Sequence, residues 1–215
     1  MAGFDPISLA LVLAALALLP TLVVVSTTFL KVAVVMSLMR NALGVQQIPP
    51  NIAIYGLTLI ITAYIMAPVG QNIYESVTAS PEITRSVDKT FQAFTRGAEP
   101  MREFLYRHSD RDQRNFFVQA AKELWSPQVA AKLQEKDFIV LMPAFMVTEL
   151  TSAFKIGFLL FLPFVVIDLI VSNILLALGM MMVSPVMISM PIKLFLFVMV
   201  DGWSRLVHGL IETYR

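Results

Sequence analysis

Long uncharged stretches on both sides of a charged middle segment restrict what this chain can fold into. Residues 7–30 and 52–73 contain no Asp, Glu, Lys or Arg, and each is long enough for a bilayer-crossing helix, which needs about 20 apolar residues. Apolar sequence returns at Phe138 and continues to the end of the chain. Only 14% of the residues are charged, against about 25% in soluble domains. These features predict an all-α, multi-pass membrane protein.

The middle segment, residues 74–137, holds ten of the chain's 15 acidic side chains and ten of its 16 basic ones. A segment with this composition belongs in water. We therefore expect three parts: an N-terminal helical membrane hairpin (1–73), a small charged helical domain (74–137) and a C-terminal helical hairpin (138–215).

Two Ser-Pro pairs in the middle segment mark expected helix starts. Ser80-Pro81-Glu82 combines an N-cap residue, a first-turn proline and an early acid, and Gly97 is expected to end the helix that follows. Ser126-Pro127 predicts a second helix over 128–136. Apolar residues recur at helical spacing in the first of these helices: Ile83, Val87, Phe91 and Phe94.

The distribution of basic residues predicts an orientation in the membrane. The loop around 31–51 contains Lys31 and Arg40, whereas no Lys or Arg precedes it. The positive-inside rule then puts this loop in the cytoplasm, and both the N-terminus and residues 74–137 outside. Residues 186–200 form a short segment with Pro191 and Lys193, which a lipid-exposed span would not favour. We therefore expect part of this apolar surface to be buried against other subunits.

The sequence lacks the residue patterns of enzymes and cofactor sites. It has no cysteine and only His108 and His208, so no zinc ligand set is expected. No phosphate-binding loop, H-E-x-x-H or G-x-S-x-G motif occurs. The net charge of +1 gives no indication of a nucleic-acid partner. We expect no enzyme activity, no metal and no cofactor.

Five ionisable residues interrupt the apolar C-terminal part: Glu149, Lys155, Asp168, Lys193 and Asp201. Charges at membrane depth are costly and usually have partners. Glu149, Lys155 and Asp168 do not have the spacing of three or four residues that pairs charges along one helix. We therefore expect pairs between helices or between subunits. The alternative reading is a relay of protons or ions through these carboxylates.

The run from Asp168 to Pro185 is almost uncharged and contains Met180, Met181 and Met182 in succession. Methionine is flexible and polarizable, so three together suit a deformable seal, although methionine more often fills a core. If residues 156–182 form one helix, one of its stripes carries Asp168, Ser172, Leu175, Gly179 and Met182. A second stripe, Asp201, Arg205, His208 and Glu212, predicts an ion pair between Asp201 and Arg205.

Several ordered blocks resemble the SctR/FliP proteins of bacterial type III secretion and flagellar export. The resemblance covers most of the chain outside 74–137, and the forms of 44–51 and 172–174 are more similar to the virulence branch than to the flagellar one. The blocks are Arg40–Gly44 with Pro49–Asn51, Leu141–Phe145, Glu149-Leu150 with Ala153-Phe154, Ile156–Phe158, Pro163-Phe164 with Ile167–Leu169, Ala177–Met182 with Pro185, and Lys193-Leu194 through Asp201–Trp203.

This resemblance implies a core subunit of the inner-membrane export apparatus. Family members form a pentamer that joins S and T type subunits in a helical ring, largely above the bilayer plane, with which a U type subunit associates. The ring is the portal through which unfolded secreted proteins enter. The resemblance assigns Met180, Met181 and Met182 to a gasket that closes this channel. Glu149, Lys155 and Asp168 would then fix neighbouring protomers in the ring.

Two other functions are compatible with the residues alone. A proton-coupled transporter or ion channel would use the intramembrane carboxylates, and a structural scaffold would not line a pore at all. These readings differ in what they expect of the methionine triplet, because only a pore-lining subunit needs it as a barrier to ions.

Overall fold

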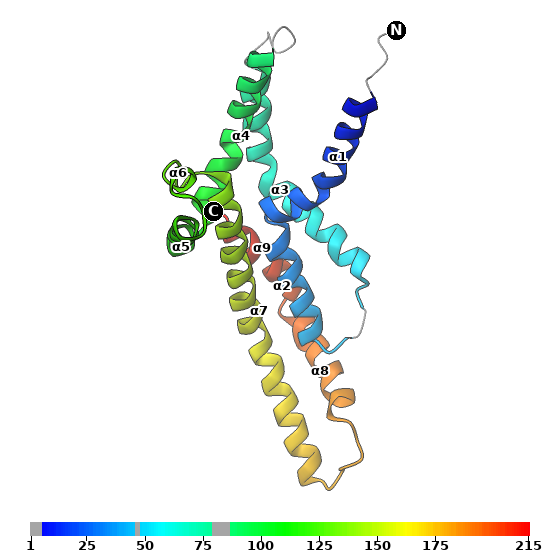
Figure 1. The fold of residues 1–215 in the computed structure, drawn as a ribbon. Coiled ribbons are helices and arrows are strands. Elements are labelled where there is room, and N and C mark those ends of the chain that lie inside the picture. The colour runs from blue at the N-terminus through cyan, green and yellow to red at the C-terminus, as the bar shows by residue number, and fades with distance from the viewer. Residues whose placement is uncertain (1–5, 46–47, 79–86) are drawn as a thin grey trace. The chain divides into compact units, whose positions relative to one another are not determined.

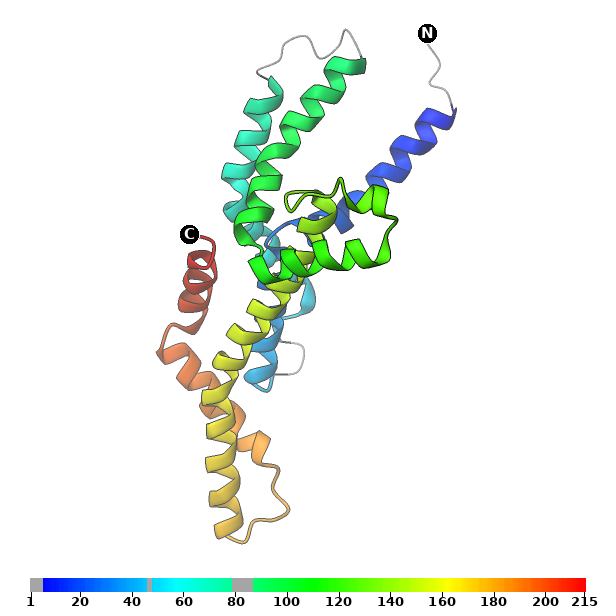
Figure 2. The same cartoon turned by 60° about the vertical axis from the view of Figure 1, so that its left-hand side comes forward.

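The computed structural model describes residues 6–45, 48–78 and 87–215, and these residues form helices and connecting turns without any strand. The all-α class predicted from the sequence is confirmed. Figures 1 and 2 show the helices from two sides. Their bounds are α1 Pro6–Ser26, α2 Phe29–Ala42, α3 Asn51–Thr78, α4 Val87–His108, α5 Arg111–Leu124, α6 Pro127–Ala130, α7 Phe138–Ala177, α8 Pro185–Met199 and α9 Gly202–Glu212.

Two helices are long and apolar enough to cross a membrane by themselves. These are α3, with 28 residues, and α7, with 40, far more than the roughly 20 that a bilayer requires. The bent pairs formed by the end of α1 with α2, and by α8 with α9, raise the number of candidate spans to four if each pair counts as one span. The described residues therefore fit a multi-pass membrane protein.

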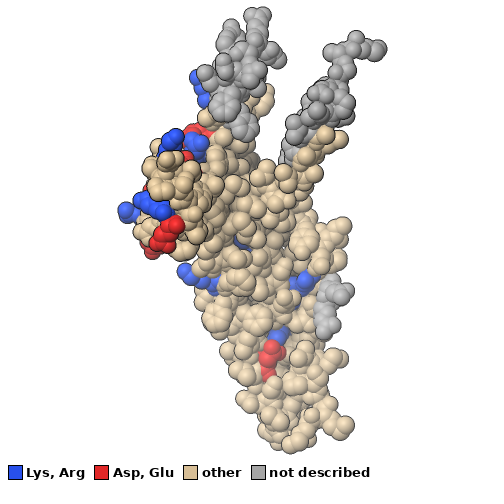
Figure 3. All heavy atoms as spheres, in the orientation of Figure 1, with Lys and Arg blue, Asp and Glu red and all other residues tan. Residues whose placement is uncertain are grey.

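The chain divides into two compact units, Met1–Leu30 with Asn72–Met146, and Lys31–Gln71 with Val147–Arg215. We call them the first and the second unit. The division into 1–73, 74–137 and 138–215 remains a prediction. Figure 3 shows charged side chains gathered over α4 to α6 of the first unit, and a nearly uncharged surface over the lower parts of α7 and α8 in the second.

In the first unit, Arg114 ties α5 to the segments on either side of it. Its side chain is buried, and its Nε donates to Glu135 Oε1 at 2.7 Å. Its Nη1 donates to the carbonyl oxygens of Tyr106 and Ser109, and its guanidinium lies 4.3 Å from the centre of the Tyr106 ring. Asp110 caps α5 by accepting from the backbone N–H of Asp112.

Two sequence-based boundaries in the first unit are wrong. Helix α4 does not end at Gly97 but continues to His108. The glycine instead leaves room for a neighbouring side chain, because a Cβ at this position would lie 2.9 Å from Val77 Cγ2 of α3. The helix expected over 128–136 is only the four residues of α6. Beyond it, Asp137 accepts from the backbone N–H of Gln134 and draws the chain into turns. The expected start at 80–82, and Ile83 with it, lies outside the described residues.

The core of the second unit is built from one apolar face of each of its helices. Buried residues on α2 recur at helical spacing, and α3, α7, α8 and α9 pack further apolar side chains against them. Gly157 permits α2 and α7 to approach closely, since a Cβ there would meet Leu38 Cδ1 at 2.3 Å. The core comprises Val32, Val35, Met36, Met39, Ala42, Leu43, Ile54, Ile61, Ala153, Phe164, Phe197, Leu206 and Leu210.

Candidate gate loop and its supporting hairpin

The methionine triplet lies in the loop that joins α7 to α8, not on a helix. Helix α7 ends at Ala177, and Gly179 adopts a left-handed conformation with φ of 74°. The backbone N–H of Met180 donates to Leu175 O, and that of Gly179 donates to Leu176 O. These two bonds form a Schellman motif, which terminates a helix at a left-handed residue.

The early end of α7 overturns the expected helix over 156–182 and the stripe that was to reach Met182. Only Asp168, Ser172 and Leu175 of that stripe lie on the helix, because Gly179 redirects the chain. The three methionines are exposed instead: Met180 by 42%, Met181 by 81% and Met182 fully. Pro185 then occupies the first turn of α8, where its missing N–H costs nothing.

Asp168 and Lys193 hold the two arms of this hairpin together. Lys193 Nζ lies 2.6 Å from Asp168 Oδ2, and Ser189 Oγ donates to Asp168 Oδ1 at 2.6 Å. Lys193 also donates to the carbonyl oxygen of Ala42 at the end of α2, at 3.3 Å. Lys193 and Ser189 are buried, so the loop rests on an α7–α8 hairpin fixed by a charged hydrogen-bond network. Figures 1 and 2 show the loop at the far end of this hairpin.

Glu149 lies in a second network, deep in the second unit. Lys31 Nζ of α2 is 2.8 Å from Glu149 Oε1, and both side chains are buried. The Tyr214 hydroxyl donates to Glu149 Oε2, and the Lys31 ammonium lies 4.1 Å from the centre of the Tyr214 ring. Burial, together with the adjacent carboxylate, raises the pKa of the Tyr214 phenol, so the hydroxyl remains a donor.

Sequence reasoning did not select Lys31 or Tyr214 as partners of Glu149. Lys31 carried a signal, because it directly follows the uncharged run 7–30 and a lysine in that position needs a counter-charge. Tyr214 carried none, since an aromatic residue near the end of an amphipathic helix has many uses. The networks give two of the three carboxylates that an ion relay could use, Glu149 and Asp168, a lysine partner within the chain.

Lys155 and Asp201 are exposed, and within the described part of the chain neither forms an ion pair. The predicted pair of Asp201 with Arg205 is absent as well. Asp201 precedes α9 and has a left-handed backbone conformation with φ of 53°, so it does not continue the helix on which Arg205 lies. Within the described ranges, no three His, Asp or Glu side chains meet as metal ligands would.

Comparison with known proteins gives matches over nearly the full length of the chain. The FliP family model matches residues 12–210. The chain belongs to the FliP family. It is 52% identical to the Yop proteins translocation protein R of Yersinia pestis over 210 residues, which cover 98% of this chain and 97% of that protein.

Two further relatives carry names from virulence and secretion. The hypersensitivity response secretion protein HrcR of Ralstonia nicotianae is 46% identical, with 97% of each chain covered. The virulence protein YscR of Salmonella typhimurium is 42% identical over 98% of this chain and 97% of that protein. The resemblance to the virulence branch of the type III export subunits is therefore confirmed.

Membership in the FliP family decides the general role of this chain. It is a subunit of a protein-secretion apparatus, and the family is a structural component of that apparatus rather than a known enzyme family. Its apolar helices and its family indicate an inner-membrane protein. A role in protein transport by type III secretion, and the presence of membrane helices, are therefore confirmed.

Proposed function

We propose that this FliP-family chain forms part of the portal through which unfolded proteins enter the type III secretion channel, and that Met180, Met181 and Met182 close it. The observation that carries this proposal is the position of the triplet: three exposed methionines in a short loop at the end of a hairpin fixed by Asp168 and Lys193.

The side chains of the triplet suit a pore that must seal around varied substrates. An unfolded polypeptide offers every kind of side chain, so the seal has to work without specific recognition. Methionine has three rotatable bonds and a polarizable sulfur, and it can repack around whatever passes. When the pore is empty, a ring of such side chains forms an apolar constriction that obstructs water and ions.

One loop cannot close a pore, so the proposal requires several copies around an axis. By family resemblance these are a pentamer that joins S and T type subunits in a helical ring, with a U type subunit bound to it. Lys155 and Asp201 are exposed and form no ion pair with any residue that the structure describes, so they are available for contacts between copies. Glu149, Asp168 and Lys193 keep the fold of each copy fixed while the loop moves.

The proposed orientation follows the basic residues. Residues 31–42 belong to helix α2 rather than to a loop, and Lys31 is paired with Glu149, so the orientation rests on Arg40 in the last turn of α2. This end of α2 lies in the cytoplasm, and the charged segment 74–137 forms a periplasmic domain. The amphipathic helices α4 and α5, with the buried Arg114 network between them, are suited to that aqueous compartment.

The test replaces all three methionines by alanine in cells that carry the complete apparatus. We expect ions to leak across the membrane while the complex still assembles, because alanine is too short to meet across the pore. Ion leakage, secretion of substrates and assembly are measured in parallel. The Met199→Ala variant is the control, since Met199 is also exposed but lies at the end of α8. A tight membrane with normal secretion in the triple variant would exclude the triplet as the seal.

A further inference from the structure

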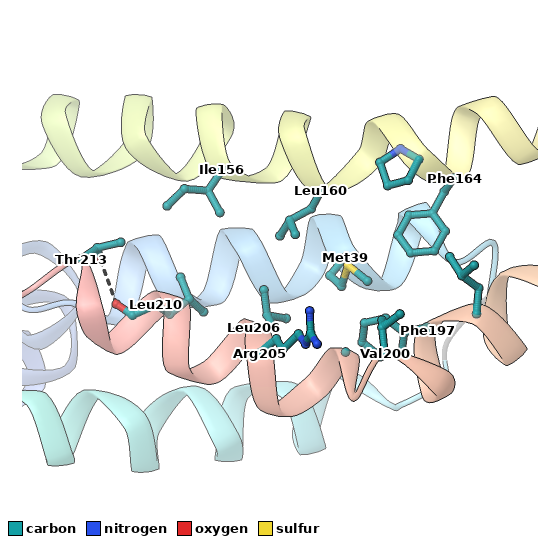
Figure 4. Close-up of a pocket in the computed structure, with 14 residues that line it drawn as sticks. Met39, Ile156, Leu160, Phe164, Phe197, Val200, Arg205, Leu206, Leu210 and Thr213 are labelled. Atoms are coloured by element: carbon teal, nitrogen blue, oxygen red, sulfur yellow. Dashed lines mark hydrogen bonds between the residues drawn. The ribbon is translucent and has the colours of Figure 1, made fainter.

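An apolar cavity of about 340 Å³ lies within the second unit, outside the gate loop and its hairpin network. Residues of α7 form one wall, α8 and α9 form the other, and Met39 of α2 contributes to the floor (Figure 4). Along α7 the lining residues Ile156, Leu160 and Phe164 recur every fourth position. Eight residues of helix correspond to about 12 Å, so the cavity is an elongated groove.

The α9 side of the groove is open at Gly209. A Cβ added to this glycine would meet no atom within 4 Å, so the space beside the α9 backbone is unfilled. Leu206 and Leu210, on either side along the helix, point into the buried core. A cavity with apolar walls does not hold ordered water, which needs two to four polar partners, and instead accommodates an apolar ligand.

Arg205 is the one charged side chain that lines the groove within the described residues. It is exposed and forms no ion pair there, and Figure 4 shows its guanidinium directed from α9 into the cavity. No acidic residue shares the lining. An unpaired guanidinium presents a planar set of donors that matches the oxygens of a phosphate group.

The surroundings of the groove determine the class of ligand that reaches it. Helix α7 and the bent pair of α8 and α9 have the length and hydropathy of membrane spans, so the groove is built between strongly apolar segments of a membrane protein. A ligand with one narrow apolar chain and one anionic group would fill the groove and satisfy Arg205 at once. Phospholipids with an acidic headgroup have this chemistry.

We propose that this groove binds an anionic phospholipid, with an acyl chain along Leu160 and Phe164 and the phosphate on Arg205. The site is separate from the methionine loop, so it stands whether or not that loop closes a pore. A bound lipid would fill the space between α7 and α9 and fix the bend between α8 and α9, which is 63° in the structure.

Two substitutions separate the parts of the site. Gly209→Leu fills the open space without a clash and raises helix propensity, so the variant should fold while excluding the acyl chain. Arg205→Gln removes the charge and leaves the apolar walls intact. Gly70→Leu is the matched control, because Gly70 of α3 is also a helical glycine whose added Cβ would meet nothing, and it does not line the groove.

The experiment uses the full chain, purified in detergent and mixed with phosphatidylglycerol or with phosphatidylcholine of the same acyl composition. Native mass spectrometry counts the lipid retained. We expect the wild type and Gly70→Leu to retain phosphatidylglycerol in preference, and Gly209→Leu to lose both lipids. Arg205→Gln should bind phosphatidylglycerol at least about tenfold more weakly, because a hydrogen bond to a charged group is lost.

Photoactivatable phosphatidylglycerol gives a second readout on the unmodified protein, with labelling expected at peptides containing Leu160 or Phe164. Retention of lipid by Gly209→Leu at the wild-type level would overturn the acyl site. Equal retention of the two lipids, unchanged in Arg205→Gln, would overturn the headgroup site. Labelling confined to other helices, or a groove covered by a neighbouring subunit in the assembled complex, would overturn the proposal as a whole.

Discussion

Glu149 is a carboxylate with 1% exposure, and its two oxygens contact two different parts of the chain. One faces Lys31 on α2 and the other accepts from Tyr214 beyond the end of α9. A buried charge of this kind adds little net stability when paired, because desolvation offsets the attraction. Removing only one of the two charged partners is costly, since the other charge then stays buried without a counter-charge. The network therefore acts as a constraint on how α2, α7 and the C-terminal residues pack.

We expect the Lys31→Met variant to lose about 3–5 kcal/mol of stability, because it leaves the Glu149 carboxylate buried without a counter-charge. The double variant Lys31→Met/Glu149→Gln should lose less, since the glutamine is neutral and its oxygen still accepts from Tyr214. Melting of the purified chain in detergent measures both. Lys155→Met is the control for removing a lysine, and its exposed side chain should matter little. A double variant less stable than the single one would contradict this account.

At the scale of elements, two glycines of α3 and α7 occupy opposite environments. Gly157 lies on α7 against Leu38, where an added Cβ would be 2.3 Å from Cδ1 and 3.2 Å from the Cβ of that leucine. Gly70 lies on α3 with nothing within 4 Å of an added Cβ. Alanine at Gly157 should cost about 1–3 kcal/mol through overpacking. Alanine at Gly70 should instead stabilise the helix by about 0.5–1 kcal/mol.

The same melting experiment in detergent compares Gly157→Ala with Gly70→Ala. Opposite signs are expected, because the first substitution pushes α2 from α7 and the second only restricts the unfolded chain. Equal effects on the two melting temperatures would show that the close approach of α2 and α7 does not hold in the folded protein.

Glycines also show where sequence reasoning succeeds and where it fails. Sequence reasoning predicted the helical class and the membrane helices from the length of the uncharged runs, since a bilayer-crossing helix needs about 20 apolar residues. It gave Gly97 as a helix end and treated Gly179 as a point within a helix, and the structure reverses both. A glycine can provide space for a neighbour, as Gly97 does for Val77, or a left-handed turn, as Gly179 does. Only the surrounding fold distinguishes these uses.

The candidate site was partly predictable for the same reason. Met180, Met181 and Met182 stood out because they are three methionines in succession. Their exposure was not predicted, because the sequence analysis extended the helix to Met182 whereas α7 ends at Ala177. The need for partners of Glu149 and Asp168 followed from the cost of burying a charge. Their identity did not, because Lys31 and Lys193 lie on other helices and spacing along one helix carries no information about them.

At the scale of the whole molecule, Lys155 and Asp201 are charges of opposite sign that the described fold leaves exposed and without an ion pair. Lys155 lies on α7 beside the exposed side chains of Phe154 and Phe158. In a ring of identical subunits, one surface of each copy contacts a different surface of the next. A contact between Lys155 of one copy and Asp201 of its neighbour would satisfy both charges at every interface.

The chain contains no cysteine, so thiols can be introduced at these two positions without a background reaction. We expect the Lys155→Cys/Asp201→Cys variant, treated with a short bismaleimide in the assembled complex, to give a ladder of covalent oligomers whose highest band counts the copies in the ring. Either single variant should remain monomeric, because a head-to-tail contact needs both thiols. The Lys122→Cys/Asp201→Cys variant controls for random collision, since Lys122 lies exposed on α5. A ladder in this control, or none in the test variant, would place the subunit contact elsewhere, and dimers from one single variant would indicate a two-fold rather than a ring contact.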